Sequence, residues 1–297
     1  MLSKSRRLVP FFLAASLLGA DRYRASEPHM GTLVTITLYA DSDEQAQRGF
    51  VAAFARIEAL NAILSDYKPD SELSRACEIA TLSPELTTVL AHAQRLARKT
   101  GGAFDITAGP LSRVWRQARS QKRLPADDAL ADALRRSGYR KLQFSEEART
   151  VECLAPGMQL DAGGIAKGYA ADEAVVTLRK MGIRSALVAI SGDIAIGDAP
   201  PGERGWRVRV QDRTLILSNA GVSTSGDEFQ FVEIDGVRYS HIFDPRTGKA
   251  LRNSGSVSVI ANSGMEADAS ATAISVLNSE GSSRRGPIVD IRTCAMM

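Results

Sequence analysis

The sequence predicts a protein of mixed helices and strands, in which strands and amphipathic helices follow one another along the chain. Apolar residues recur at helical spacing over 46–64 and over 86–96, so both segments are expected to be helices with one buried face. Near the C-terminal end, Asp235-Gly236 separates two segments, 229–234 and 237–242, in which apolar and polar residues alternate. An Asp-Gly pair in that position is typical of a two-residue β-hairpin turn.

The composition is that of a folded protein with a substantial core. The chain has 297 residues, of which 44% are hydrophobic and 24% charged, enough for one large or two small domains. The formal net charge of +3 is too small to indicate a nucleic-acid partner, and no Lys/Arg-rich run with interleaved aromatics is present. Nucleic acid is therefore not an expected partner.

Residues 1–20 are typical of an export signal. Basic residues precede a mostly apolar segment, 8–20, that is too short to span a bilayer. The Arg6-Arg7 pair leaves Sec and Tat export both open. Asp21 stands where a lipoprotein would carry its acylated cysteine, so no lipid anchor is expected. We expect an exported, periplasmic protein, with an uncleaved N-terminal extension as the alternative.

The cysteines, Cys77, Cys153 and Cys294, are too few and too scattered for a disulfide framework or a metal site. We expect buried thiols, with one Cys77–Cys153 bridge as the alternative.

The remaining patterns place the expected elements in chain order. In the N-terminal half these are a strand over 32–39, a helix from the Ser42 capping box to 64, a polar loop over 65–75, a helix from Ser83-Pro84 to Gly101-Gly102, a glycine-rich loop over 101–111, a helix over 126–137 and a strand pair around 145–149. In the C-terminal half they are strands over 186–190, 194–196, 206–210, 215–217 and 256–261, a helix over 265–277 and an irregular tail over 279–297.

The segment 160–172 is expected to enter as a strand, turn at Gly163-Gly164 and leave as a helix. Amide groups at the N-terminus of that helix could bind phosphate oxygens, with Lys167 adding a positive charge. The sequence matches neither a Walker motif nor a dinucleotide fingerprint, so a purely structural turn is an equal alternative.

Asp268 and Thr272 lie four residues apart and so on one face of the last helix. A carboxylate and a hydroxyl there suit a hard cation, and a helix cap is the alternative. Polar residues also gather at the two ends of the hairpin, over 223–227 and 240–248. Since antiparallel strands bring such ends together, both groups are expected to meet at one edge of a sheet.

Taken together, the segments over 28–277 resemble the ApbE family, the FAD:protein FMN transferases. The resemblance rests on His29-Met30-Gly31-Thr32, SDYKPDSELSR (65–75), GGAFDITAGPL (101–111), LDAGGIAKGYAAD (160–172), AISGDIAIG (189–197), STSGD (223–227), YSHIFDPRTG (239–248) and EADASAT (266–272).

The resemblance implies a Mg2+-dependent, exported enzyme that transfers the FMN half of FAD to a Ser or Thr hydroxyl of an acceptor flavoprotein, a redox or respiratory complex subunit, and releases AMP. It implies an ApbE-like, T-fold-related α+β fold, in which one compact unit of two lobes has antiparallel-rich sheets flanked by helices. The catalytic domain would span 28–278. The alternatives are an FAD pyrophosphatase that gives FMN and AMP, and a non-catalytic, exported FAD-binding protein.

The resemblance also implies the site residues. FAD contacts are expected from Met30, Tyr67, Ala103, Phe104, Asp105, Asp161, Lys167 and Ile242. The metal ligands would be Gly164 and Ala166, through the backbone of their turn, together with Asp268 and Thr272. His241 is the candidate general base, because a hydroxyl is a poor nucleophile until its proton is removed. A buried, hydrogen-bonded structural histidine is the alternative for His241, and Asp244 and Arg246 are expected to pair with each other.

The sequence departs from the family pattern at Ile106, at Ala162 and after Leu277, where the usual closing strand pattern is missing.

Overall fold

The computed structural model describes residues 20–226, 231–252, 255–278 and 285–292. The expected export signal lies outside these residues, except for Ala20. No helix within the described ranges is both long and apolar enough to cross a membrane.

The largest element of the fold is a mixed sheet, which within the described residues has seven strands in the order β1-β2-β5-β6-β9-β13-β14. All neighbours are antiparallel except β13 and β14, which are parallel. The strands are β1 (Asp21–His29), β2 (Thr32–Ala40), β5 (Ala186–Ile190), β6 (Asp193–Ile196), β9 (Ala220–Ser225), β13 (Ser256–Ala261) and β14 (Arg285–Asp290).

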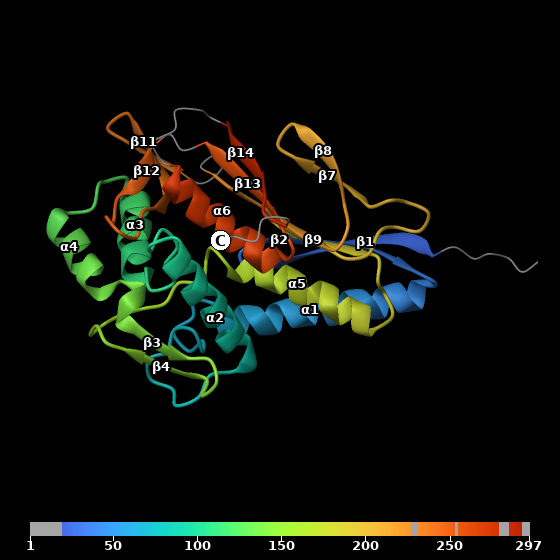
Figure 1. Ribbon diagram of the computed structural model, residues 1–297, viewed down its shortest axis with the longest axis horizontal. Helices are drawn as coiled ribbons and strands as arrows, with labels where there is room; N and C mark the ends of the chain where they lie inside the picture. The colour runs from blue at the N-terminus through green and yellow to red at the C-terminus, as the bar shows by residue number, and fades with distance from the viewer. Residues whose placement is uncertain (1–19, 227–230, 253–254, 279–284, 293–297) are drawn as a thin grey trace, which may run out of the picture.

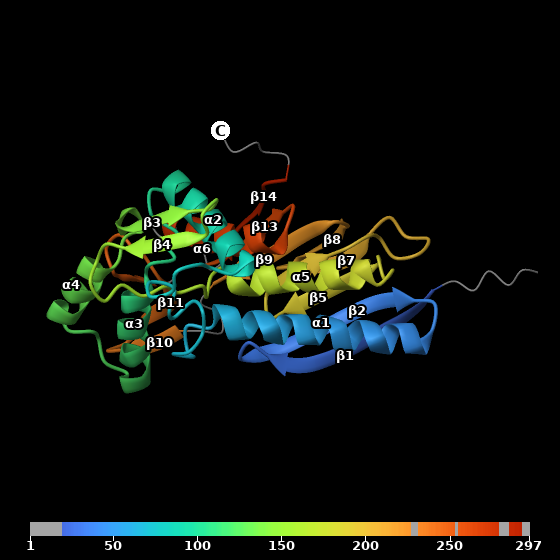
Figure 2. The ribbon, with the colours of Figure 1, turned by 90° about the horizontal axis from the view of Figure 1, so that it is seen from below.

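The described helices cover one face and one end of this sheet (Figure 1). They are α1 (Asp43–Leu64), α2 (Pro84–Lys99), α3 (Gly109–Gln121), α4 (Asp127–Arg136), α5 (Ala166–Lys180), α6 (Gly264–Leu277) and the short 3-10 helix η1 (Tyr139–Lys141). Figure 2 shows α1 and α5 side by side along the sheet. Side chains of the sheet such as Ile36 and Val188 are fully buried against Phe54, Ile57 and Leu178 of these helices, and this contact forms the main core.

A hairpin of β7 (Trp206–Val210) and β8 (Arg213–Leu217) packs on part of the other face of the sheet. Trp206, Val208 and Val210 alternate with arginines along β7 and pack on the sheet residues Val222 and Ile260. The alternation explains why this strand was predictable, since one of its faces is buried and the other is exposed.

A second lobe lies at one end of the sheet, where α3 packs on a small sheet of β10 (Phe231–Ile234), β11 (Val237–Phe243) and β12 (Ala250–Arg252) (Figure 1). The indole nitrogen of Trp115 donates to the carbonyl oxygen of Gly248 at 2.8 Å. The predicted hairpin is confirmed, because Ile234 pairs with Val237 across Asp235-Gly236 and both turn residues have positive φ.

The helices expected at 46–64, 86–96, 126–137 and 265–277 are confirmed, as is the strand pair of β3 (Leu142–Ser145) and β4 (Thr150–Cys153). Five strand assignments were wrong, and two of them are the strands β9 and β12, which were not expected. β1 was missed because it is polar and mostly exposed. The strand expected before Gly163 is only an isolated bridge between Ala108 and Gln159. The tail after Leu277 is not irregular throughout, because β14 adds a parallel strand beside β13.

Helix α3 was also missed, since its start at Gly109-Pro110 looks like a loop. Its buried face consists of Leu111, Ser112, Trp115 and Ala118, and proline is well tolerated in the first turn.

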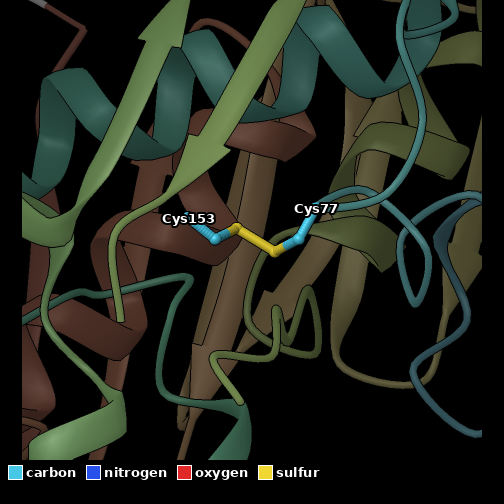
Figure 3. The surroundings of a disulfide bond; sticks show 2 residues. All are labelled: Cys77 and Cys153. Carbon is cyan, nitrogen blue, oxygen red and sulfur yellow. A yellow bond between two sulfur atoms is a disulfide. The ribbon is translucent and has the colours of Figure 1, made fainter. Parts of the chain in front are cut away.

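The expectation of buried thiols was wrong for the first two cysteines. Cys77 and Cys153 form a disulfide, with their Cα atoms 5.6 Å apart (Figure 3). Cys77 lies in the polar loop region after α1, and Cys153 is the last residue of β4. The bond therefore fixes the region that follows α1 to the β3–β4 hairpin.

Candidate active site

The site is built around a close contact between α5 and α6. Gly168 and Gly264 face each other without side chains, and a Cβ on Gly168 would collide with the carbonyl oxygen of Gly264. The carboxylate of Asp172 accepts from the backbone nitrogens of Gly264 and Met265, at 2.7 and 2.8 Å, and so caps α6. The contact brings Asp268 to the N-terminus of α5, where its Oδ2 accepts from the Gly168 nitrogen at 3.1 Å.

Four polar side chains from four elements meet at this contact. The Nζ of Lys167, from α5, binds Oδ2 of Asp193, from β6, and lies 3.9 Å from Oδ2 of Asp268. Ser223, from β9, donates to Oδ1 of Asp193 at 2.6 Å. Asp193 and Asp268 are only 3% and 2% exposed, so both carboxylates depend on these partners rather than on water.

The charges of this cluster are unequal, because one ammonium group faces two buried carboxylates. Burial raises the pKa of Asp268 to about 7, the charge of Asp193 adds to this effect, and Lys167 opposes it. Burial alone would lower the pKa of Lys167, but the charges of Asp268 and Asp193 raise it above its ordinary value. Lys167 is therefore a fixed cation. Because it faces two carboxylates, binding of a further cation beside them would be favoured electrostatically.

Oxygen atoms that could hold a cation lie beside Asp268. The hydroxyls of Thr272 and Ser225 are 3.5 Å apart. Gly164 lies against Thr272, since a Cβ on Gly164 would be 2.9 Å from the Thr272 hydroxyl oxygen. In the ranges that the structure describes, no three His, Cys, Asp or Glu side chains gather in a way that could hold a metal. The donors near one another are the Asp268 carboxylate and the hydroxyls of Thr272 and Ser225, a set that fits a hard cation such as Mg2+, which keeps several waters.

Ala166 is the first residue of α5, and its nitrogen donates to the carbonyl oxygen of Ala162 at 2.8 Å. Because the nitrogens of Ala166 and Gly168 already have internal acceptors, these amides are not free for phosphate. Lys167 is likewise paired within the protein. The turn thus has a structural role that the sequence left open.

The loop 103–105 lies beside the same turn. Ala103 and Phe104 are buried, and the Phe104 ring would be 3.4 Å from a Cβ on Gly164. The Asp105 carboxylate accepts from the nitrogen and hydroxyl of Thr107, at 2.8 and 2.7 Å, and from the nitrogen of Tyr139 at 2.7 Å. Burial raises the pKa of Asp105, and these hydrogen bonds oppose the shift. The contacts of Asp105 organise its own loop.

His241 and Ile242 lie in β11, where the pairing with β12 shifts register between Tyr239 and Phe243. Such an irregularity redirects side chains and is common next to active sites. Ile242 packs with Ala103 and with Val276, one helical turn beyond Thr272. The half-buried His241 is thus held in a strand that contacts both the 103–105 loop and α6.

The two polar groups at the hairpin ends were expected to meet at one edge of a sheet. This expectation was wrong. Ser223 and Ser225 belong to the large sheet, whereas Ser240 belongs to the β10–β12 sheet. They are nevertheless related through α6, which Ser225 approaches at Thr272 and Ile242 approaches at Val276. Part of the first end, Asp227, lies outside the described residues.

The pairing expected between Asp244 and Arg246 is confirmed, with both guanidinium bonds at 2.9 Å.

Another polar group contains Tyr67 and Asp161. Asp161 accepts from the nitrogen of Gly163 at 2.7 Å, and its other oxygen lies 3.4 Å from an Arg116 nitrogen. Arg116 also pairs with Asp66 and stacks over the Tyr67 ring, 4.2 Å from its centroid. Sequence reasoning missed Arg116 because it missed α3.

Met30 occupies the tight turn between β1 and β2, with φ of 50°. Its partly buried side chain packs against the main core. Sequence reasoning also missed Asp193 and Ser225 as site residues. Both lie in segments that carried the resemblance, which was the available signal.

Comparison with known proteins shows the family to which this chain belongs. The model of the ApbE family matches residues 30–284. The chain belongs to the ApbE family. It is 33% identical over 289 residues to the FAD:protein FMN transferase of Treponema pallidum, covering 88% of this chain and 80% of that protein. The same name is borne by a Vibrio cholerae protein that is 31% identical over 280 residues, covering 88% and 83% of the two chains.

Solved ApbE structures have the same fold. The ApbE protein of Thermotoga maritima superposes with a TM-score of 0.78 at 28% identity, covering 88% of each chain. The flavinyl transferase ApbE of Pseudomonas stutzeri, in its apo form, gives a TM-score of 0.76 at 30% identity, covering 88% of this chain and 86% of that one. The expected ApbE-like α+β fold is therefore confirmed.

Proposed function

We propose that this ApbE protein is an FAD:protein FMN transferase that moves the FMN half of FAD to a Ser or Thr hydroxyl of an acceptor protein and releases AMP. The observation that carries the proposal is the α5–α6 contact, which gathers Lys167, Asp193 and Asp268 beside the hydroxyl of Thr272. A buried cluster of this kind, with excess negative charge and oxygen donors, suits a cation that binds a pyrophosphate. The names of the relatives support the same reaction.

The proposed reaction exchanges one P–O bond for another. The acceptor hydroxyl oxygen forms a bond to the phosphorus of the FMN half, the bond from that phosphorus to the AMP oxygen breaks, and AMP leaves with the electron pair. His241 takes the hydroxyl proton. Asp268 and Thr272, with backbone oxygens of Gly164 and Ala166, would hold Mg2+, which supplies neutralisation of charge on the phosphate oxygens when bound.

The FAD contacts are proposed on two sides of this centre. Tyr67 and Asp161 form one side, with Met30, and the 103–105 loop with Ile242 forms the other. The packing of Ile242 on Ala103 supports the second grouping. Lys167 would act through its fixed charge on the pyrophosphate side of the site.

We also propose that the protein works in the periplasm on an exported redox flavoprotein. The basic and apolar pattern of residues 1–20 supports export. The Cys77–Cys153 bond supports it independently, because disulfides persist in oxidising compartments.

The test is to incubate the purified protein with FAD, Mg2+ and an acceptor domain that bears a suitable Ser or Thr. Flavin fluorescence on the denatured acceptor, with AMP in equal amount, is the expected result, and replacing the target hydroxyl by Ala should abolish it. AMP and free FMN without labelling would indicate a pyrophosphatase, and FAD binding without turnover would indicate a binding protein. Either outcome would overturn the transferase.

His241→Ala should keep FAD binding and lose transfer by about 100-fold or more, since a positioned base contributes at least that much. His92→Gln is the matched control, because burial lowers the pKa of His92 to about 4 and keeps it neutral on α2. Transfer by His241→Ala within a few-fold of the unmodified protein would remove His241 as the base.

A further inference from the structure

Arg116 links two segments that are distant in the sequence. From α3 its guanidinium pairs with Asp66, lies 3.4 Å from the Asp161 carboxylate and stacks on Tyr67 at 4.2 Å. Asp66 and Tyr67 belong to the loop after α1, whereas Asp161 precedes the Gly163-Gly164 turn. One planar side chain thus fixes both segments.

Among the residues that the structure describes, Arg116 is the one placed over the Tyr67 ring. Tyr67 is 76% exposed although Arg116 covers one face of its ring. Its nitrogen donates to the Ser65 hydroxyl at 3.3 Å, which fixes the backbone but not the ring. An aromatic ring with a cation on one face and an open opposite face is suited to stacking on a flat ligand.

The two carboxylates need Arg116 between them. Burial raises the pKa of Asp66, the charge of Asp161 adds to the rise, and Arg116 opposes it. Arg119, one turn further on, lies in the same electrostatic environment, but in the described part of the chain it forms no ion pair. Without Arg116 the like charges of Asp66 and Asp161 would repel each other, and the loop would lose its contact with the turn.

We infer that Arg116 is a positioning residue for FAD, which holds the Tyr67 ring and the Asp161 carboxylate in the arrangement that binds the flavin nucleotide. The inference rests on the proposed function for the identity of the ligand. A lysine cannot replace the guanidinium, because it cannot pair with carboxylates in a planar fork and stack on a ring at the same time.

The experiment compares Arg116→Met and Arg116→Lys with Arg113→Met as the matched control. Arg113 is exposed on the same helix, and within the described residues it has no ion pair. The dissociation constant of FAD is measured without acceptor, and KM and kcat are measured with it. Arg116→Met should raise both the FAD dissociation constant and the KM for FAD by about 10-fold or more, with kcat within about 2-fold, and Arg116→Lys should recover only part of the affinity.

An FAD dissociation constant within about 2-fold of the unmodified protein in Arg116→Met would overturn the inference, as would a loss of kcat alone. A double-mutant cycle with Tyr67→Leu provides the second measurement. If Arg116 acts through Tyr67, Arg116→Lys should weaken FAD binding much less in the Tyr67→Leu variant than in the unmodified protein. Additive effects of the two substitutions would contradict the action of Arg116 through Tyr67. Binding is read without acceptor, so a failure of FMN transfer in the unmodified protein would not be confused with a failure of this inference.

Discussion

Asp268 illustrates how much a single residue contributes to the site. Its carboxylate is buried, receives one backbone hydrogen bond from Gly168 and shares Lys167 with Asp193. Asp268→Asn keeps the shape of the side chain but removes its charge. We expect the Mg2+ concentration for half-maximal transfer to rise by about 10-fold or more, because an amide oxygen is a weaker ligand for a hard cation. A Mg2+ titration of the transfer rate measures the effect.

Glu266→Gln is the control for this titration. It removes one negative charge from the first turn of the same helix, and Glu266 forms no ion pair within the ranges that the structure describes. An unchanged Mg2+ titration in Asp268→Asn, or an equal shift in Glu266→Gln, would contradict the assignment of Asp268 as a ligand.

At this scale the sequence predicted what depends on local spacing. Asp268 and Thr272 were expected on one helical face from their separation alone, and their neighbours on α5 and β9 are consistent with that. The pairing of Lys167 with Asp193 was not predictable, because it depends on where α5 packs on the sheet relative to β6. Arg116 was hidden for a different reason, since its helix begins with a loop-like Gly-Pro pair.

At the scale of whole elements, the close contact of α5 and α6 should depend on the absence of a side chain at Gly168. A Cβ on Gly168 would meet backbone atoms of Gly264 and would lie 2.8 Å from the Cβ of Asp268. Because backbone cannot yield as a flexible side chain does, Gly168→Ala should lower the free energy of unfolding by about 3 kcal/mol and displace Asp268. Thermal or denaturant unfolding, together with the transfer assay, measures both effects.

Gly202→Ala separates collision from backbone strain. Gly202 has φ of +76°, but a Cβ there would meet no atom within 4 Å. It should lower the free energy of unfolding by only about 1 kcal/mol and leave transfer unchanged. Equal losses of stability in the two variants would mean that the helices do not depend on the glycine contact.

Helices and strands were predictable where buried and exposed residues alternate regularly along them. Strand β7, with alternating buried and exposed residues, and helix α2, which is capped by Ser83 and begins at Pro84, carried clear signals. Strand β1 carried none, because its residues are mostly exposed and it is held mainly by backbone pairing with β2. Which strands share a sheet was equally hidden, as the separation of β9 from β11 shows.

At the scale of the whole molecule, the disulfide joins residues separated by 76 positions. In the chain-entropy account, closing a loop of that length raises the free energy of the unfolded chain by about 4 kcal/mol, because it lowers the conformational entropy of that chain. The double substitution Cys77→Ser with Cys153→Ser should therefore lower the free energy of unfolding by up to about 4 kcal/mol. Reductant should lower the Tm of the unmodified protein and leave that of the double variant unchanged.

Thermal unfolding with and without reductant measures this prediction, and thiol titration confirms that the bond is open. An unmodified protein with fully reduced thiols and an unchanged Tm would show that the bond contributes no stability. Since Cys77 is exposed, the reductant should reach the bond in the folded protein.

The turn at Met30 has a consequence for how such a protein can be engineered. A left-handed methionine costs about 1 kcal/mol, and Asn-Gly is the sequence that such hairpin turns favour. Selection for heat resistance alone would therefore replace Met30, whose side chain is proposed to contact FAD. Replacing Met30 by Asn to relieve this strain would exchange flavin affinity for stability, so position 30 should be left untouched when the enzyme is adapted to harsher conditions.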